Sequence, residues 1–248
     1  MKALPGLSVF FPAYNDAPSL PALVPQAFEV AACLTEDFEV IVVNDGSADH
    51  TEEVLAELSR LLGPRLRVVR HAVNQGYGAA VRSGFRSATK DWVFYTDGDG
   101  QYDLSELPRL VEPLGPGVGL VNGYKTSRSD VFYRVWIGRI YLGAVRRLFR
   151  LQIRDVDCDF RLVKRSLLDR FAFESTSGTI CVELVRKLQD TGCGIVEIPV
   201  RHLPRLHGRS QFFRPRNLVK SLWQLAGLYF RLLGWRRTEA RQIACDIE

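Results

Sequence analysis

The chain has few cysteines and no long hydrophobic run. Its 248 residues include five cysteines, an odd number without paired metal-ligand spacing, so we expect reduced thiols. No uninterrupted apolar stretch is long enough to span a bilayer. The stretch after Lys2 is short and broken by Pro5 and Pro12, unlike a signal peptide. These absences favour a cytoplasmic location without a transmembrane anchor.

A glycine-rich phosphate loop is also missing near the N-terminus. The segment after the first apolar run reads PAYNDAP, residues 12–18, where dinucleotide-dependent dehydrogenases carry Gly-x-Gly-x-x-Gly. GYGAAV, residues 76–81, begins like that motif, but Val81 stands where the third glycine belongs. The sequence therefore argues against a dehydrogenase, and equally against a sugar-nucleotide pyrophosphorylase, which would need a glycine-rich N-terminal loop.

Charge is distributed unevenly along the chain. The formal net charge is only +5. Residues 125–165 carry eleven Lys or Arg against four Asp or Glu, and residues 201–241 carry ten against one. Basic segments of this kind favour an anionic partner such as a nucleotide phosphate, a lipid phosphate or a membrane surface.

Short apolar runs alternate with amphipathic stretches in the first half of the chain. The runs lie at residues 7–11, 38–43, 66–70 and 92–95, and the amphipathic stretches lie near 18–33, 50–62 and 77–89. This alternation predicts an α/β fold with a Rossmann-like, mostly parallel central sheet flanked by helices. Such sheets bind ligands beyond the carboxyl ends of their strands, so we expect the site in the loops that follow the runs.

The loop after the fourth run, TDGDGQYD at residues 96–103, is strongly acidic. Asp97 and Asp99 lie two residues apart, and the intervening glycine lets the backbone approach a ligand closely. Neighbouring carboxylates repel and raise a pKa, a conflict that a divalent cation removes. Oxygen ligands suit Mg²⁺ or Mn²⁺, with water and substrate phosphates completing the shell. A solvated acidic turn is the alternative, and Asp103 is expected to cap the next helix.

Motifs in a fixed order give the chain a family resemblance over about residues 5–214. They are Pro12, Ala13, Tyr14 and Asn15; VVNDGSADHT (42–51); Asn74, Gly76 and Gly78; TDGDGQYD (96–103); DVDCDFRLVKRSLL (155–168); and EIPVRHLPRLHGRSQF (197–212). With these motifs the chain resembles glycosyltransferase family 2, and within it the dolichol- or polyprenyl-phosphate sugar transferases, such as the dolichol-phosphate mannosyltransferases.

The resemblance implies a GT-A fold and an inverting, metal-dependent enzyme. It would move a hexose, mannose or glucose, from GDP-mannose or a UDP-sugar to a polyprenyl or dolichyl phosphate, using Mg²⁺ or Mn²⁺. The enzyme would associate peripherally with a membrane surface and could form a homo-oligomer, and no nucleic-acid partner is expected. A family 2 transferase with a glycan or other hydroxyl acceptor is the alternative, as is a non-catalytic subunit that binds nucleotide sugars.

The resemblance also implies roles for individual residues. Asp99 and Gln101 would hold the metal, and Asp99 and Arg205 would act in catalysis. Asp16 stands where the family commonly has Glu, and His207 and Gln211 lie in the same basic segment as Arg205. Nucleotide-sugar binding is implied for Pro12, Ala13, Tyr14, Asn15, Asp16, Asp45, Asn74, Gly76, Asp97, Gly98, Arg205, Arg209 and Ser210.

The segment DVDCDFR, residues 155–161, leaves the acceptor open. The family's segment ends in Ser-Gly-Phe-Arg, whereas Asp159 stands here in place of the glycine, and Asp155 matches the family's leading aspartate. A hydroxyl acceptor would need a general base, for which Asp157 or Asp159 is the candidate. A lipid phosphate is already anionic at pH 7, so Arg161 would position it instead.

Two basic, amphipathic stretches lie at residues 132–151 and 218–235. Each predicts a helix that either packs on the core or lies in a membrane interface. We expect a catalytic domain at 1–214, which includes the first stretch, and a C-terminal amphipathic helix and tail at 215–248. In the first stretch the predicted apolar face consists of Ile137, Ile140, Tyr141, Ala144, Leu148 and Leu151, with Arg139, Arg146 and Arg150 on the opposite face. In the second stretch it consists of Leu218, Leu222, Leu225, Tyr229 and Leu232, with Lys220, Gln224 and Arg231 on the opposite face.

Overall fold

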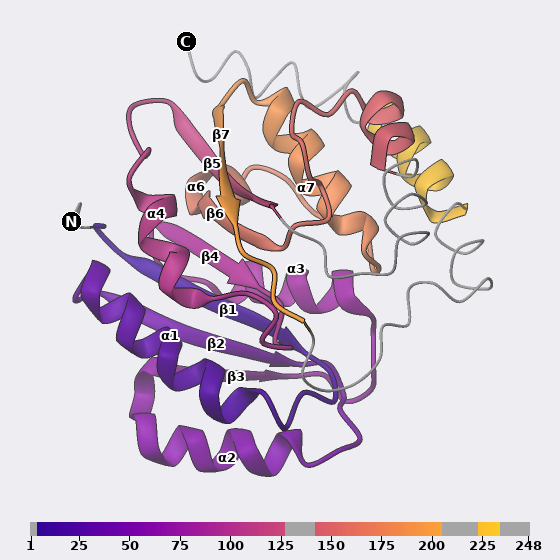
Figure 1. Ribbon diagram of the computed structural model, residues 1–248. Coiled ribbons are helices and arrows are strands. Elements are labelled where there is room, and N and C mark those ends of the chain that lie inside the picture. The colour runs from indigo at the N-terminus through magenta and orange to yellow at the C-terminus, as the bar shows by residue number, and fades with distance from the viewer. Residues whose placement is uncertain (1–3, 127–141, 205–222, 234–248) are drawn as a thin grey trace.

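The computed structural model describes residues 4–126, 142–204 and 223–233, and its strands form one twisted sheet covered by helices on both faces (Figure 1). The strands are β1 (Leu7–Ala13), β2 (Phe38–Asn44), β3 (Leu66–Arg70), β4 (Trp92–Thr96), β5 (Val118–Lys125), β6 (Phe160–Lys164) and β7 (Gly194–Val200). The helices are α1 (Leu20–Leu34), α2 (Thr51–Leu62), α3 (Tyr77–Ser87), α4 (Leu107–Val111), α6 (Arg165–Leu168) and α7 (Thr179–Asp190), with short 3-10 helices at Gly63–Arg65 and Leu104–Glu106.

The sheet is mostly parallel, as predicted. Its seven described strands have the order β3-β2-β1-β4-β6-β5-β7. Every pairing is parallel except those of β6, which runs antiparallel to β4 and β5. The carboxyl ends of six strands and the amino end of β6 therefore meet at one edge, where ligands of such sheets bind.

A hydrophobic core lies on each face of the sheet, so both faces of the strands are buried and their sequences are continuous apolar runs. In β1 every residue is buried: Val9 and Phe11 pack in the core under α1, α2 and α4, whereas Phe10 packs in the core under α3 and α7. Gly84 of α3 lets that helix approach closely, since a Cβ there would lie 2.3 Å from the Phe10 ring. Strands buried on both faces lose the alternating pattern, so apolar runs of this length predict them well.

A buried polar cluster lies in the sheet away from the carboxyl edge. The Glu39 carboxylate accepts hydrogen bonds from Ser8 Oγ at 2.8 Å, from the Thr89 backbone N–H at 2.7 Å and from Arg67 Nη1 at 2.6 Å. Burial alone would raise the pKa of Glu39, but these donors outweigh it and lower that pKa. The cluster ties β1, β2 and β3 together and needs no ligand.

The two amphipathic stretches are described only in part. Residues 142–149 and 223–233 are helical and pack on the core through Val145, Phe149, Leu225, Leu228 and Leu232. The predicted face of the second stretch is confirmed at Leu225 and Leu232. The face predicted for the first is wrong at Ala144 and Leu148, which are exposed while Val145 and Phe149 are buried, and it is confirmed at Leu151, which is buried. Within the described residues, no helix has the length and apolar character needed to cross a membrane.

Candidate functional site

The first two loops at the carboxyl edge are held to each other by hydrogen bonds. The Asn15 backbone N–H donates to Ser47 Oγ at 3.0 Å, and the Ala48 N–H donates to Asn15 Oδ1 at 2.8 Å. Asn15 has a φ of 58°, a conformation that asparagine tolerates better than most residues. Asp16 accepts from the Tyr14 N–H at 2.9 Å, and the Tyr14 side chain is about half exposed. The loop thus presents the Tyr14 ring to solvent at the edge.

The end of β1 also supports the acidic turn. Pro12 O accepts from the Gly98 N–H at 3.3 Å, and Ala13 O accepts from the Asp45 N–H at 2.9 Å. A Cβ at position 98 would lie 2.9 Å from Pro12 O, so only glycine fits that approach without a shift. Pro12, Ala13, Asp45 and Gly98, four of the predicted nucleotide-sugar residues, are therefore neighbours.

Asp45 is buried beneath the third loop. Its Oδ1 accepts from the Gln75 N–H at 2.9 Å and lies 2.6 Å from His71 Nδ1, while its Oδ2 accepts from the Gly76 N–H at 2.9 Å. His71 Nε2 lies 2.8 Å from Ser83 Oγ of α3. In this structure the carboxylate fixes the third loop, and its direct contact with a nucleoside stays a prediction.

The third loop leads into α3 through two glycines. Gly76 has a φ of 97°, and a Cβ there would lie 2.5 Å from Thr176 O. The Gly78 N–H donates to the same oxygen at 3.1 Å. Asn74 is exposed beside this turn. The segment that contains Thr176 therefore forms a wall of the edge, and the glycines are needed for its close approach.

The acidic turn places the Asp97 carboxylate close to two others. Burial and the carboxylates of Asp159 and Asp99 raise the pKa of Asp97 well above its usual range. Burial, with Asp159 and Asp97, likewise raises the pKa of the Tyr77 phenol. Asp97 directly follows β4 and Asp159 directly precedes β6, so the pairing of these strands brings together carboxylates that lie 62 residues apart.

Asp99 and Gln101 lie on the next turn of the same loop. Asp99 Oδ1 accepts from the Gln101 N–H at 3.1 Å, and Gln101 Nε2 donates to Leu203 O at 3.2 Å. That donor fixes the amide, so its oxygen is the atom suited to a cation. Among the described residues, no three His, Cys, Asp or Glu side chains are placed to hold a metal ion. A carboxylate and an amide oxygen fit a cation that takes its remaining ligands from a diphosphate and water.

Asp103 is confirmed as a cap. Its Oδ1 accepts from the Ser105 N–H at 3.0 Å at the start of the 3-10 helix Leu104–Glu106, and its Oδ2 accepts from Arg201 Nη2 at 2.9 Å.

The two candidate bases have different surroundings. Asp157 is exposed at the edge. Asp159 is 9% exposed, and its Oδ1 accepts from Cys181 Sγ at 3.1 Å and from Tyr95 Oη at 3.4 Å. Burial and a guanidinium partner, described next, make Asp159 less accessible than Asp157, and its role as a base stays a prediction.

Arg161 requires the clearest correction, because its side chain is completely buried. Nε donates to Asn122 Oδ1 at 2.7 Å, Nη1 donates to Tyr95 Oη at 2.5 Å and lies 3.5 Å from Asp159 Oδ1, and Nη2 donates to Val156 O. All three nitrogens are thus used inside the protein. Arg161 holds the floor of the site together and does not reach an acceptor phosphate.

Lys125, at the end of β5, is a site residue that the motifs missed. Its Nζ donates to Asp157 O at 2.6 Å and lies 4.0 Å from Asp155 Oδ2. Burial alone would lower the pKa of this ammonium, but Asp155 and other nearby acidic groups raise it, so it is a cation. The one available signal was its place directly after an apolar run, VGLVNGY, residues 118–124.

Part of the predicted site lies outside the described residues. This applies to Arg205, Arg209 and Ser210, and to His207 and Gln211 beside them. Their roles stay predictions.

Comparison with known proteins gives a consistent family and fold. A model of glycosyl transferase family 2 matches residues 8–172. The undecaprenyl-phosphate 4-deoxy-4-formamido-L-arabinose transferase of Edwardsiella ictaluri is 28% identical over 211 residues, which are 85% of this chain and 64% of that protein. The protein of the same name from Pseudomonas paraeruginosa is 32% identical over 214 residues, 86% of this chain and 62% of that protein. The chain thus spans a little under two thirds of these relatives.

Among solved structures, glucosyl-3-phosphoglycerate synthase from Mycobacterium tuberculosis, in complex with Mn²⁺ and UDP-glucose, has a similar fold. The TM-score is 0.67 at 21% sequence identity, over 90% of this chain and 79% of that one.

Proposed function

The chain belongs to glycosyl transferase family 2, and from this membership we propose that it transfers a sugar, with inversion, from a nucleotide diphosphate to a polyprenyl phosphate. The observation that carries the proposal is the acidic turn of Asp97, Asp99 and Gln101, held against the end of β1 at the carboxyl edge. Lys125 provides a cation beside that turn. The relatives are named as transferases to undecaprenyl phosphate, which favours a lipid phosphate as acceptor.

We propose a UDP-sugar as the first donor to test and GDP-mannose as the second. The solved structure with this fold contains UDP-glucose, and the relatives are named for a modified arabinose, so the transferred sugar is a hexose or a related pentose derivative. The half-exposed Tyr14 ring offers a surface on which a base could stack.

A divalent cation, Mg²⁺ or Mn²⁺, fits between this turn and the donor diphosphate. Asp99 and the Gln101 amide oxygen would hold it, and it would stabilise the negative charge that develops on the departing diphosphate. Burial and the carboxylates of Asp159 and Asp99 raise the pKa of Asp97, and a cation beside these carboxylates would offset their repulsion.

The surroundings of the acceptor fit a nucleophile that needs no strong base. A phosphate monoester is anionic at pH 7, and the Lys125 ammonium can orient it. A hydroxyl acceptor would require a base, and exposed Asp157 is the more accessible of the two candidates. The preference for a lipid phosphate comes from the relatives, which are named as transferases to undecaprenyl phosphate, and Lys125 takes the positioning role once expected of Arg161.

We propose that the enzyme meets the membrane through the outer face of the helix at residues 223–233. Trp223 and Phe230 are 77% and 72% exposed, and Leu233 is 37% exposed. Their spacing places them on one face, opposite the buried Leu225, Leu228 and Leu232. Exposed aromatics on a helix in a basic segment are typical of binding to an anionic lipid surface.

The proposal is tested by partition of radiolabel. Protein, Mn²⁺, a labelled UDP-sugar or GDP-mannose, and undecaprenyl phosphate are incubated, and the label is followed into an organic phase. Asp99→Asn should abolish turnover while the protein remains folded. Asp103→Asn, the same change four residues away, should keep activity and cost at most about 1 kcal/mol of stability, since the amide oxygen still accepts from the Ser105 N–H and only the partly exposed ion pair with Arg201 is weakened. Label entering only water-soluble glycans would favour a hydroxyl acceptor, and UDP or GDP binding without turnover would indicate a non-catalytic subunit.

A further inference from the structure

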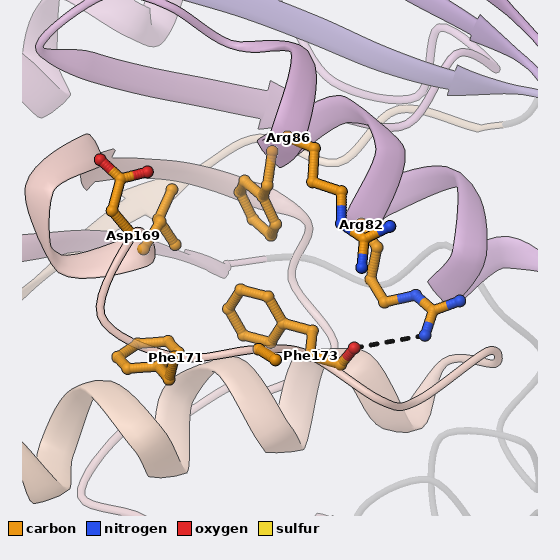
Figure 2. Close-up of a pocket in the computed structure, with 8 residues that line it drawn as sticks. Arg82, Arg86, Asp169, Phe171 and Phe173 are labelled. Atoms are coloured by element: carbon orange, nitrogen blue, oxygen red, sulfur yellow. Dashed lines mark hydrogen bonds between the residues drawn. The ribbon is translucent and has the colours of Figure 1, made fainter.

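A second cavity lies between α3 and the segment that follows α6, away from the acidic turn. It has a volume of about 300 Å³ and is lined by Arg82, Phe85, Arg86, Leu168, Asp169, Phe171, Ala172 and Phe173. Figure 2 shows the aromatic rings around its interior, with the two arginines entering from α3 on one side. This volume is at the lower end of the roughly 300–1,000 Å³ typical of small-molecule sites.

The polar part of the cavity is cationic. Arg82 and Arg86 are four residues apart on α3, so their like charges lie on one face of the helix and repel. Arg82 Nη1 donates to Phe173 O and Glu174 O, both at 3.2 Å, whereas Arg82 Nε is buried without an acceptor among the described residues. An anion between the two guanidinium groups would relieve the repulsion.

The one lining carboxylate does not supply that anion. Asp169 Oδ2 accepts from Arg165 Nη1 at 2.8 Å, and Figure 2 shows the Asp169 carboxylate turned away from Arg82 and Arg86 at the other end of the cavity. Among the described residues that line the cavity, no other carboxylate is available to the pair, so a ligand could supply the complementary negative charge.

The remaining lining is apolar and mostly aromatic. Phe173 stacks on Phe85 with ring centroids 5.5 Å apart, and it meets the Phe171 ring edge to face at 5.3 Å. Lys187 Nζ donates to Ala172 O at 2.6 Å and holds the segment in place from α7. Such a floor suits a flat apolar or aromatic body.

The position separates this cavity from the proposed transfer site. Arg82 lies at the middle of α3 and Arg86 near its end, whereas the carboxyl edge is at its first residue, Tyr77. The two places are joined by one segment, since Thr176 O accepts from the Gly78 N–H three residues beyond Phe173.

From this geometry we propose that the cavity is a binding site for a small anion with an aromatic or apolar body, such as an aryl carboxylate. The guanidinium groups of Arg82 and Arg86 would bind the anionic group, and Phe85, Phe171 and Phe173 would enclose the body. The proposal does not depend on the transfer reaction, because binding is measured without donor or acceptor.

The test is calorimetric titration of the full chain with 2-naphthoate, and with 2-naphthalenemethanol as its uncharged match. We expect a dissociation constant for 2-naphthoate below about 1 mM, and binding of the alcohol at least about tenfold weaker. Arg86→Glu should weaken 2-naphthoate binding at least about tenfold. Ala172→Trp, which fills the rim, should abolish it. Positions 86 and 172 are exposed, so both variants should fold, as thermal unfolding would verify.

The matched control is Arg60→Glu, the same charge reversal at an exposed position on α2, which should leave 2-naphthoate binding unchanged. The proposal is overturned if 2-naphthoate produces no saturable heat up to about 5 mM. It is overturned equally if the alcohol binds as tightly as the carboxylate, or if Arg86→Glu and Ala172→Trp bind like the wild type.

Discussion

Replacing Arg161 with methionine should destabilise the protein severely, because this side chain is a buried counter-ion. The substitution leaves the Asp159 carboxylate without the guanidinium 3.5 Å away, and Asn122 Oδ1 and Val156 O without their donors. Breaking a buried ion pair by removing one partner costs about 3–5 kcal/mol. In a chain of this length that loss corresponds to a fall in Tm of roughly 10 °C.

Urea unfolding followed by circular dichroism measures the effect directly. Arg70→Met is the matched control, since Arg70 pairs with Glu52 at the surface, where the expected cost is about 0–1 kcal/mol. Adding Asp159→Ala to Arg161→Met should recover part of the loss, because the uncompensated charge is then gone. If Arg161→Met unfolded within about 1 kcal/mol of the wild type yet lost affinity for lipid phosphate, Arg161 would be a ligand and the structural role would be refuted.

Three further substitutions test the edge and the sheet. Gly78→Ala should lower both stability and UDP affinity, because its Cβ would lie 2.6 Å from the carbonyl oxygens of Ser175 and Ser177; unfolding and titration with UDP measure the two effects. Asp97→Asn should stabilise the ligand-free protein at neutral pH by about 1 kcal/mol while turnover falls. Because the pKa of Asp97 is raised, the protonated carboxyl stabilises the folded protein at low pH, and this stabilisation is lost as pH rises through that pKa. An Asp97→Asn protein that is less stable than the wild type at pH 7 would contradict this account. The lowered pKa of Glu39 gives the opposite sign: its contribution is present above about pH 4.5 and is lost below it. The stability difference between wild type and Glu39→Gln should therefore shrink on acidification, and a constant difference would count against it.

Much of the fold could be predicted from the sequence, since a buried parallel strand leaves a local signal. All four predicted strands and all three predicted helices of the first half are present. Their topology also places the loops at one edge. The sequence pattern could not show which polar side chains of a strand become buried when helices cover both faces of the sheet. Arg161 looked accessible because it follows a polar segment, but β6 is buried on both faces between β4 and β5. Lys125 was missed because no motif contains it.

The roles of the carboxylates at the edge depend on which cation lies beside each one. The charge of Asp159 is met by the buried guanidinium of Arg161, and Lys125 lies near Asp155. The pKa of Asp97 is raised by burial and by the carboxylates of Asp159 and Asp99, which outweigh the effect of Lys125. A divalent cation that arrives with the donor diphosphate would therefore be stabilised most next to Asp97 and Asp99. The stability that the ligand-free chain loses by burying Asp97 would then be recovered when the donor binds, which is how a strained site favours its ligand.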